Sequence, residues 1–314
     1  MSITEWCNVP PHSRGAAVAL GNFDGVHRGH VHLLETLHGA RPDLTLGVVT
    51  FEPHPREFFR PQDPPMRLMV PDVRARFLRR HHVSHIFQMS FNEAFSNINP
   101  RSFVDDILCD GLGVKHVACG PDFAFGHRRT GDVPMLGQWL EARGVGLTIV
   151  DPLTDRGGPL SSSRIRRLLR EGYPEKAEEE LGRPWFISGT VIEGDKRGRQ
   201  IGFPTANIAL GQHLEPARGV YAVTIARPDE ADAPIWAGVA NLGRRPTIND
   251  GRVSQLEVHV FDFDGDLYGQ TLEVSFHTLL REERKFENFA ALAAQIGRDA
   301  ETARAFLTAR GFPR

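Results

Sequence analysis

The sequence predicts two folded units: an α/β unit with a parallel sheet, followed by a small antiparallel β-barrel that ends in a helix. Strand and helix patterns alternate over the first half, which is typical of parallel strands joined by helices. After residue 182 the helical spacing stops until about residue 282, and short β-rich runs separated by turn residues replace it. A chain of 314 residues suits two domains, which we place at residues 1–182 and 183–314.

The individual elements follow from apolar runs and from apolar residues at helical spacing. In the first half we expect strands at residues 16–20, 46–51, 85–89, 114–119 and 146–150. We expect helices from about residue 31, at residues 72–80, after Ser102 as the capping residue, and at the acidic stretch 175–180. In the second half we expect strands at residues 185–192, 219–225, 234–242, 254–261 and 271–276, and a helix from about residue 287.

The composition is that of a globular protein, with 40% hydrophobic and 24% charged residues. A net charge of −2 argues against general nucleic-acid binding, which normally needs a basic surface. The three cysteines form no C-x-x-C pair and indicate reduced thiols. No signal peptide and no apolar run of about 20 residues is found. We therefore expect a cytoplasmic protein that binds neither nucleic acid nor membrane, as a monomer or weak homo-oligomer.

A glycine-rich turn joins the first predicted strand to the first predicted helix, at residues 21–30 (Gly-Asn-Phe-Asp-Gly-Val-His-Arg-Gly-His). Backbone N–H groups at a helix start are unpaired and the helix dipole is positive there, so phosphate binds well. His27 and His30 add side-chain donors to the same anion. Two ordinary polar loop residues are the weaker explanation, because Gly25 and Gly29 flank them. The turn therefore predicts a phosphate site.

Two further loops follow predicted strands and should lie at the same edge of the sheet. In the first, two prolines bracket His54, and a rigid turn explains the segment as well as substrate contact does. In the second, residues 120–127, the rings of Phe123 and Phe125 either flank a flat ligand or fill the core. These two interpretations carry equal weight.

A serine-rich helix start at residues 161–166 carries two arginines in its first turn. The helix dipole disfavours cations at this end, so Arg164 and Arg166 are in conflict with it. An anionic ligand would resolve the conflict, and arginine can bind phosphate oxygens in a bidentate manner. We favour ligand binding over an ordinary capped helix.

The second half has a loop with three glycines and three cations at residues 194–202, which can fold over phosphates or be a charged surface hairpin. Thr205 and Asn207 follow it and face the same way on an extended segment. Both offer neutral oxygen ligands for Mg²⁺. Glu257 alternates with apolar residues in a predicted strand, and on this pattern alone it is a solvated glutamate.

The motifs of both halves resemble those of one family. The turn at residues 21–30 is similar to the motif G-x-F-D-G-x-H-x-G-H, the extended form of the nucleotidyltransferase motif H-x-G-H. Residues 160–166 are similar to I-S-S-T-x-x-R, with leucine and serine in place of isoleucine and threonine. Residues 194–207 are similar to the G-x-x-x-G-x-x-x-G-F-P-T-A-N segment of riboflavin kinases. Over about residues 15–310 the chain resembles the bacterial bifunctional riboflavin kinase/FAD synthetase family.

The resemblance implies a Rossmann-like nucleotidyltransferase domain in the first half, in which the FMN phosphate attacks the α-phosphorus of ATP to give FAD and pyrophosphate. His27 and His30 would then steady the α-phosphate. The further contacts that it implies are Asn22, Ser162, Ser163 and Arg166 for ATP, and Asp122, Phe123 and Phe125 for the flavin.

For the second half the resemblance implies a riboflavin kinase barrel that transfers the γ-phosphoryl group of ATP to riboflavin, giving FMN. Glu257 would accept the proton of the terminal ribityl hydroxyl, and Thr205 and Asn207 would organise Mg²⁺ and ATP. The phosphate-covering glycines that it implies are Gly194, Gly198 and Gly202.

Two other classes of protein stay open at this point. One is a nucleotidyltransferase for a different substrate with an accessory β domain. The other is a flavin-binding protein without catalysis. The predicted catalytic and metal-binding side chains are all present, which argues against this second class. A chain with only one active half is a third possibility.

Overall fold

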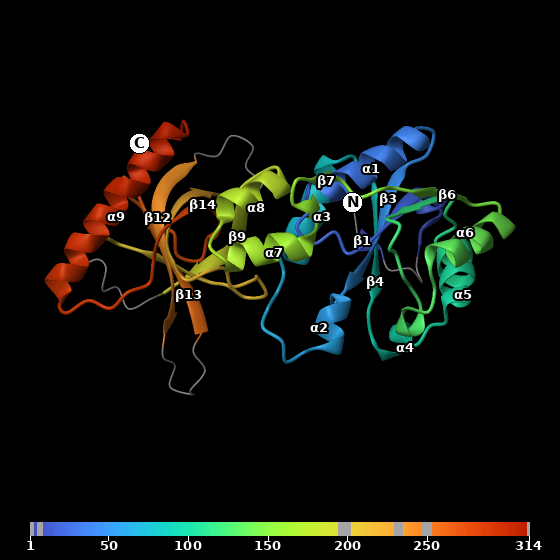
Figure 1. Ribbon diagram of the computed structural model, residues 1–314, viewed down its shortest axis with the longest axis horizontal. Helices are drawn as coiled ribbons and strands as arrows, with labels where there is room; N and C mark the ends of the chain where they lie inside the picture. Colours follow the sequence, from blue (N-terminus) through green and yellow to red (C-terminus); the bar gives the residue numbers. More distant parts are fainter. Residues whose placement is uncertain (1–2, 5–8, 194–201, 229–234, 246–252, 313–314) are drawn as a thin grey trace. The chain divides into compact units, whose positions relative to one another are not determined.

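The computed structural model describes residues 3–4, 9–193, 202–228, 235–245 and 253–312 (Figure 1). The chain forms two compact units, of which the first comprises residues 1–64 and 71–161 and the second residues 65–70 and 162–314. The expected pair of an α/β unit and a β-barrel with a terminal helix is confirmed. The boundary between the compact units falls between residues 161 and 162. The helices within residues 162–182 therefore belong to the unit that contains the barrel. The functional boundary at residues 182 and 183 stays a prediction.

The first unit is built on a parallel sheet of six strands in the order β1-β4-β3-β2-β5-β6. Every residue of the central strands β2 and β5 is buried, as expected for parallel strands covered by helices. The expected strands are confirmed, and β1 is additional. The strands are β1 (Ile3–Thr4), β2 (Ala17–Leu20), β3 (Leu46–Glu52), β4 (His85–Ser90), β5 (His116–Cys119) and β6 (Gly146–Ile149).

Helices connect these strands, and α1 contacts β2, β3 and β5. Apolar side chains of η3 and α6, such as Ile107 and Leu136, belong to the same buried core cluster as Val18 of β2. The remaining elements are η2 (Pro11–Ser13), α1 (Arg28–Ala40), α2 (Pro55–Phe59), α3 (Pro71–Arg80), α4 (Glu93–Ser96), α5 (Pro100–Ser102), the π-type helix η3 (Phe103–Gly111), η4 (His127–Arg129), α6 (Val133–Ala142), and the hairpin β7 (Thr154–Asp155) and β8 (Gly158–Pro159).

The expectation that Ser102 caps a helix is wrong. The helix begins earlier, because Asn99 is the capping residue and its Oδ1 accepts the backbone N–H of Ser102 at 2.9 Å. Pro100 occupies the first helical position, where its missing N–H costs nothing. The buried apolar residues that follow, Phe103, Val104, Ile107 and Leu108, are on η3.

The second unit is a closed antiparallel barrel in the order β10-β13-β12-β11-β14-β9. Helix α9 packs on β11 and β12 (Figure 1), and its Ala303 and Leu307 contact Val220 and Val239 on the outer face. The elements are α7 (Ser162–Arg170), α8 (Pro174–Leu181), β9 (Trp185–Ile192), β10 (Ala206–Ala209), β11 (Gly219–Ala226), β12 (Trp236–Arg245), β13 (Val253–Val260), β14 (Thr271–Glu282) and α9 (Phe289–Ala309).

Residues 65–70 come from the first half of the sequence and pack with the second unit. The Trp185 indole N–H donates to the carbonyl of Leu68 at 3.0 Å, and the N–H of Leu214 donates to the carbonyl of Arg67 at 2.8 Å. These long-range bonds satisfy the backbone of a segment that has no helix or sheet of its own.

His277 on β14 is a buried titratable group of the second unit, with 1% of its surface exposed. The Arg310 guanidinium lies 3.5 Å from Nδ1 and can only donate, so Nδ1 is the acceptor and Nε2–H donates to Thr224 Oγ1 at 2.9 Å. Burial, together with the nearby Arg310 charge, lowers the pKa of His277 to about 4. The folded barrel therefore holds a neutral imidazole.

We expect His277 to make the barrel less stable in acid. The unfolded chain takes up a proton near the ordinary histidine pKa of about 6.5, whereas the folded chain does so only near 4. The free energy of unfolding should therefore fall as the pH drops through this window, by up to about 1.4 kcal/mol per pH unit. Denaturant titrations between pH 7.5 and 4.5 measure this slope. His277→Gln should flatten it, while His38→Gln at an exposed position should not, and equal slopes in all three proteins would contradict the assignment.

Candidate functional sites

The predicted phosphate turn of the first unit links β2 to α1, as expected. His27 is the capping residue of α1, and its Nδ1 lies 3.4 Å from the backbone N–H of His30 that it accepts. The two imidazole rings are stacked, with centroids 3.6 Å apart and planes inclined by 22°. Phe23, fully buried, packs against His30 at a centroid distance of 5.1 Å. The turn thus presents a paired set of imidazoles at a helix start.

Backbone conformation holds this turn in shape. Phe23 and Val26 have φ values of +51° and +39°, in the left-handed region that side chains other than glycine rarely adopt. Gly25 has φ +88°, which suits glycine alone. Such conformations persist where the surrounding structure enforces them, and they concentrate at functional sites.

Gly29 is required by a close approach rather than by its φ value. A Cβ atom at this position would lie 3.1 Å from Cε1 and Nδ1 of His27, closer than carbon atoms normally pack. The glycine between the two histidines therefore lets the His27 ring lie against the first turn of α1.

For the adenylyl transfer that the resemblance implies, Gly29→Ala should lower FAD formation from FMN and ATP about tenfold. The His27 ring must then move by a fraction of an ångström, and small displacements of a catalytic group lower the rate steeply. Gly39→Ala is the matched control, since a Cβ atom there meets nothing within 4 Å on the same helix. Steady-state rates of the two variants and of the parent chain measure the effect. Equal rates for Gly29→Ala and Gly39→Ala would show that the position of His27 does not matter.

Asn22 begins the turn, and its Oδ1 is buried without a hydrogen-bond partner among the residues that the structure describes. A buried acceptor without a partner costs about 1–3 kcal/mol. The same holds for Thr50 Oγ1 at the end of the neighbouring strand β3. A polar ligand at these strand ends would supply the missing donors.

The two aromatic residues of the loop after β5 have different surroundings. Phe125 is 6% exposed and belongs to the core of the first unit, whereas Phe123 is half-buried and only borders it. Their rings are nearly parallel, with centroids 5.7 Å apart, which leaves no room for a flat ligand between them because two stacking contacts need about 7 Å. Asp122 is exposed, with its carboxylate near Gly120. The geometry favours the core role for Phe125.

The serine-rich helix start belongs to the second unit, where it forms the first turn of α7. Ser162 is half-buried and Ser163 is exposed. The conflict with the helix dipole that we attributed to a missing anion is already relieved for Arg164, which lies 2.5 Å from Glu180 of α8. Arg166 is buried, and its Nε donates to the carbonyl of Met66 at 2.8 Å. Glu180 thus supplies a counter-charge for Arg164 within the protein.

The barrel brings two predicted residues directly together. Asn207 of β10 and Glu257 of β13 are paired across the sheet, and Asn241 of β12 is paired with Glu257 on the other side. Because paired residues on antiparallel strands share a face, the three side chains form a row. Gln255 Nε2 donates to Asn207 Oδ1 at 3.1 Å and orients it. Glu257 is half-buried in this row rather than an isolated surface acid.

His259 lies two residues after Glu257 on β13, and the sequence analysis assigned it no role. Its Nδ1–H donates to the carbonyl of Pro204 at 2.8 Å, and its ring meets Phe203 edge to face at 5.2 Å. His259 thereby fixes the backbone immediately before Thr205. The signal was present in the alternation of polar residues along β13, which places His259 on the same face as Glu257.

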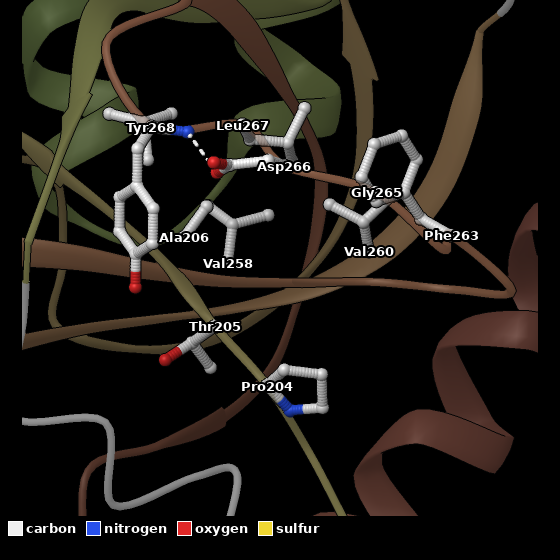
Figure 2. A pocket seen from close by; sticks show the side chains of 11 residues that line it. Pro204, Thr205, Ala206, Val258, Val260, Phe263, Gly265, Asp266, Leu267 and Tyr268 are labelled. Atoms are coloured by element: carbon white, nitrogen blue, oxygen red, sulfur yellow. Dashed lines mark hydrogen bonds between the residues drawn. The ribbon is translucent and has the colours of Figure 1, made fainter.

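A cavity of about 80 Å³ opens beside Thr205 (Figure 2). The segment Pro204–Ala206 lines one side and the loop 263–268 the other, with the Tyr268 ring extending toward the Thr205 hydroxyl. Asp266 Oδ1 accepts the backbone N–H of Tyr268 at 2.9 Å and shapes this loop. The sequence showed only a turn here, so these lining residues were missed.

The residues around Asn207 fit a magnesium ion that arrives with a nucleotide. Asn207 and Thr205 supply hard oxygen donors, which Mg²⁺ prefers. Within the described ranges no group of three or more His, Cys, Asp or Glu residues could hold a metal by itself. Gly202 is exposed with φ +80°, and the predicted Gly194 and Gly198 lie outside the described residues.

The fold and the two sites place the chain among two-domain transferases that act on nucleotides. A family model described as FAD synthetase matches residues 9–164, and one described as riboflavin kinase matches residues 181–307. A bifunctional riboflavin kinase/FMN adenylyltransferase of Pseudomonas fluorescens is 40% identical over 300 residues, which cover 95% of each chain. The proteins of the same name from Escherichia coli K12 and Bacillus subtilis are 40% and 37% identical and cover 93% and 92% of this chain, and 93% and 91% of their own lengths. The chain therefore belongs to the bifunctional riboflavin kinase/FMN adenylyltransferase family.

A crystal structure described as a macrolide-efflux protein from Streptococcus pneumoniae is also similar. It is 30% identical, covers 94% of this chain and 95% of its own, and superposes with a TM-score of 0.83. That description belongs to the streptococcal protein. Among the helices described for the present chain, none has the length and apolar character needed to cross a membrane.

Proposed function

We propose that the chain converts riboflavin to FMN in its barrel and FMN to FAD in the module of residues 1–182, using ATP in both reactions. The observation that carries most weight is the Asn207–Glu257–Asn241 row, because it combines a candidate base with oxygen donors on one face of the barrel. Family membership of both halves supports the same conclusion.

In the kinase reaction, Glu257 accepts the proton of the terminal ribityl hydroxyl of riboflavin, and the freed oxygen attacks the γ-phosphorus of ATP. The bond from that phosphorus to the β,γ-bridging oxygen breaks, so that FMN forms and ADP leaves. Thr205 and Asn207 hold Mg²⁺, which neutralises phosphate charge when it is bound. The cavity beside Thr205 receives part of the nucleotide, and the glycines at 194, 198 and 202 cover the phosphates. A positioned base of this kind contributes about 10²–10⁴ to the rate.

In the adenylyl transfer, the FMN phosphate displaces pyrophosphate from the α-phosphorus of ATP without a covalent enzyme intermediate. His27 and His30 donate to the α-phosphate, and the start of α1 adds its backbone N–H groups and dipole. The buried Asn22 Oδ1 supports a ligand at the turn. By resemblance, Ser162, Ser163 and Arg166 also contact ATP. Asp122 and Phe123 contact the flavin, while Phe125 supports them from the core.

The experiment is incubation of the full chain with riboflavin, ATP and Mg²⁺, with flavins separated by chromatography. FMN followed by FAD is the expected product series, and omission of Mg²⁺ should abolish both. Turnover of FMN without turnover of riboflavin would limit activity to the first half. Flavin binding without ATP consumption would overturn the proposal. We further propose that the protein is cytoplasmic and that it is a monomer or weak homo-oligomer. Sedimentation of the purified chain tests the oligomeric state.

A further inference from the structure

Arg74 on α3 is a buried cation that the motifs do not include. Its side chain is 4% exposed, whereas arginine is rarely buried unless it is paired. It faces two segments that are far apart in the sequence. One terminal nitrogen donates to the backbone carbonyl of Asn22 at 3.3 Å, and the other lies 3.4 Å from Glu52 Oε2.

These two partners begin the two loops at the carboxyl ends of β2 and β3. Asn22 opens the histidine turn, and Glu52 is the last residue of β3, two residues before His54. The strands themselves are paired in parallel, with Leu20 beside Val49. The strands therefore fix where the loops start, and the Arg74 fork joins the loops just beyond that point.

The chemistry of Arg74 suits this task better than it suits packing. Replacing a buried ion pair with apolar residues of similar volume is often neutral or favourable for stability, so a buried Arg–Glu pair is weak evidence for a stabilising role. The planar guanidinium, with donors pointing in fixed directions, can hold a carbonyl and a carboxylate at once. A lysine has one charged nitrogen and cannot reproduce that fork.

We infer that Arg74 is a positioning residue for adenylyl transfer, which sets the spacing between the histidine turn and the His54 loop through Asn22 and Glu52. The inference rests on the proposed adenylyltransferase function of this unit. Arg74 acts through Asn22 and Glu52 and need not touch either substrate. Its loss should therefore lower kcat for FAD formation more than it changes the KM of ATP or FMN.

The test measures FAD formation from FMN and ATP by Arg74→Met, Arg74→Lys and Glu52→Gln, with Arg80→Met as the matched control from the exposed face of α3. Riboflavin phosphorylation by the same preparations reports on the barrel, and melting curves give the folded fraction. We expect kcat per folded molecule to fall about 10²-fold in Arg74→Met, less in Arg74→Lys, and not at all in Arg80→Met.

The double variant Arg74→Met/Glu52→Gln separates positioning from simple destabilisation. If both residues act through one bridge, the double variant should be no slower than Arg74→Met alone. Unchanged kcat in Arg74→Met, or losses that multiply in the double variant, would overturn the inference. Should Arg74→Met fail to fold, Arg74→Lys and Glu52→Gln carry the same comparison. A parent chain that makes no FAD would instead refute the proposed function, and this inference with it.

Discussion

Glu257→Gln should abolish riboflavin phosphorylation while FMN is still converted to FAD. The amide keeps the shape of the side chain in its row between Asn207 and Asn241 but cannot accept the ribityl proton. We expect kcat of the kinase reaction to fall about 10²–10⁴-fold. The adenylyl transfer should keep its rate because Glu257 is not among the residues that we propose to contact ATP or FMN in that reaction.

The control for this change is Glu301→Gln, the same substitution at an exposed position of α9. It should leave both reactions unaltered. Kinetics with riboflavin and with added FMN, on equal amounts of folded protein, give the comparison. If Glu257→Gln kept a normal kinase rate, the proton would be accepted elsewhere.

His30→Ala should give the reciprocal result, with FMN accumulating and FAD formation reduced about 10²–10³-fold, the usual loss for one donor to a developing charge. The substitution removes the ring that stacks on His27 at 3.6 Å and packs on Phe23. Single-turnover adenylylation of FMN at saturating ATP measures the chemical step directly.

His38→Ala serves as the matched control, because His38 lies exposed in the last turn of the same helix. The helix should form equally well in both variants. A near-normal rate of FAD formation in His30→Ala would remove this imidazole from the mechanism and leave the phosphate site to the backbone of α1.

Local patterns explain why much of this structure could be predicted from the sequence. The strand, turn and helix around His27 follow from an apolar run, a glycine-rich segment and helical spacing, all within 25 residues of each other. On β13 the alternation is equally local: Leu256 and Val258 enter the core while Glu257 and His259 remain outside it. Neighbouring residues decide these features.

The features that could not be predicted depend on partners far away in the chain. No local pattern near residues 65–70 indicates that this segment forms hydrogen bonds with Trp185 and Leu214 of the other half. The same is true of two arginine contacts. Arg164 lies beside the carboxylate of Glu180, and the Arg74 guanidinium binds the carbonyl of Asn22, and in both cases the partner is on another element. The core position of Phe125 was undecidable because an aromatic residue suits a ligand contact and a core equally well. Only the fold brings such groups together.

The central claim is that one chain holds two separate active sites, and a mixture of the two variants tests it most directly. With riboflavin, ATP and Mg²⁺, Glu257→Gln alone should form neither flavin product, and His30→Ala alone should stop at FMN. Mixed together, the two proteins should form FAD, because each supplies the step that the other lacks. Loss of both reactions in either variant, with the protein still folded, would contradict the account.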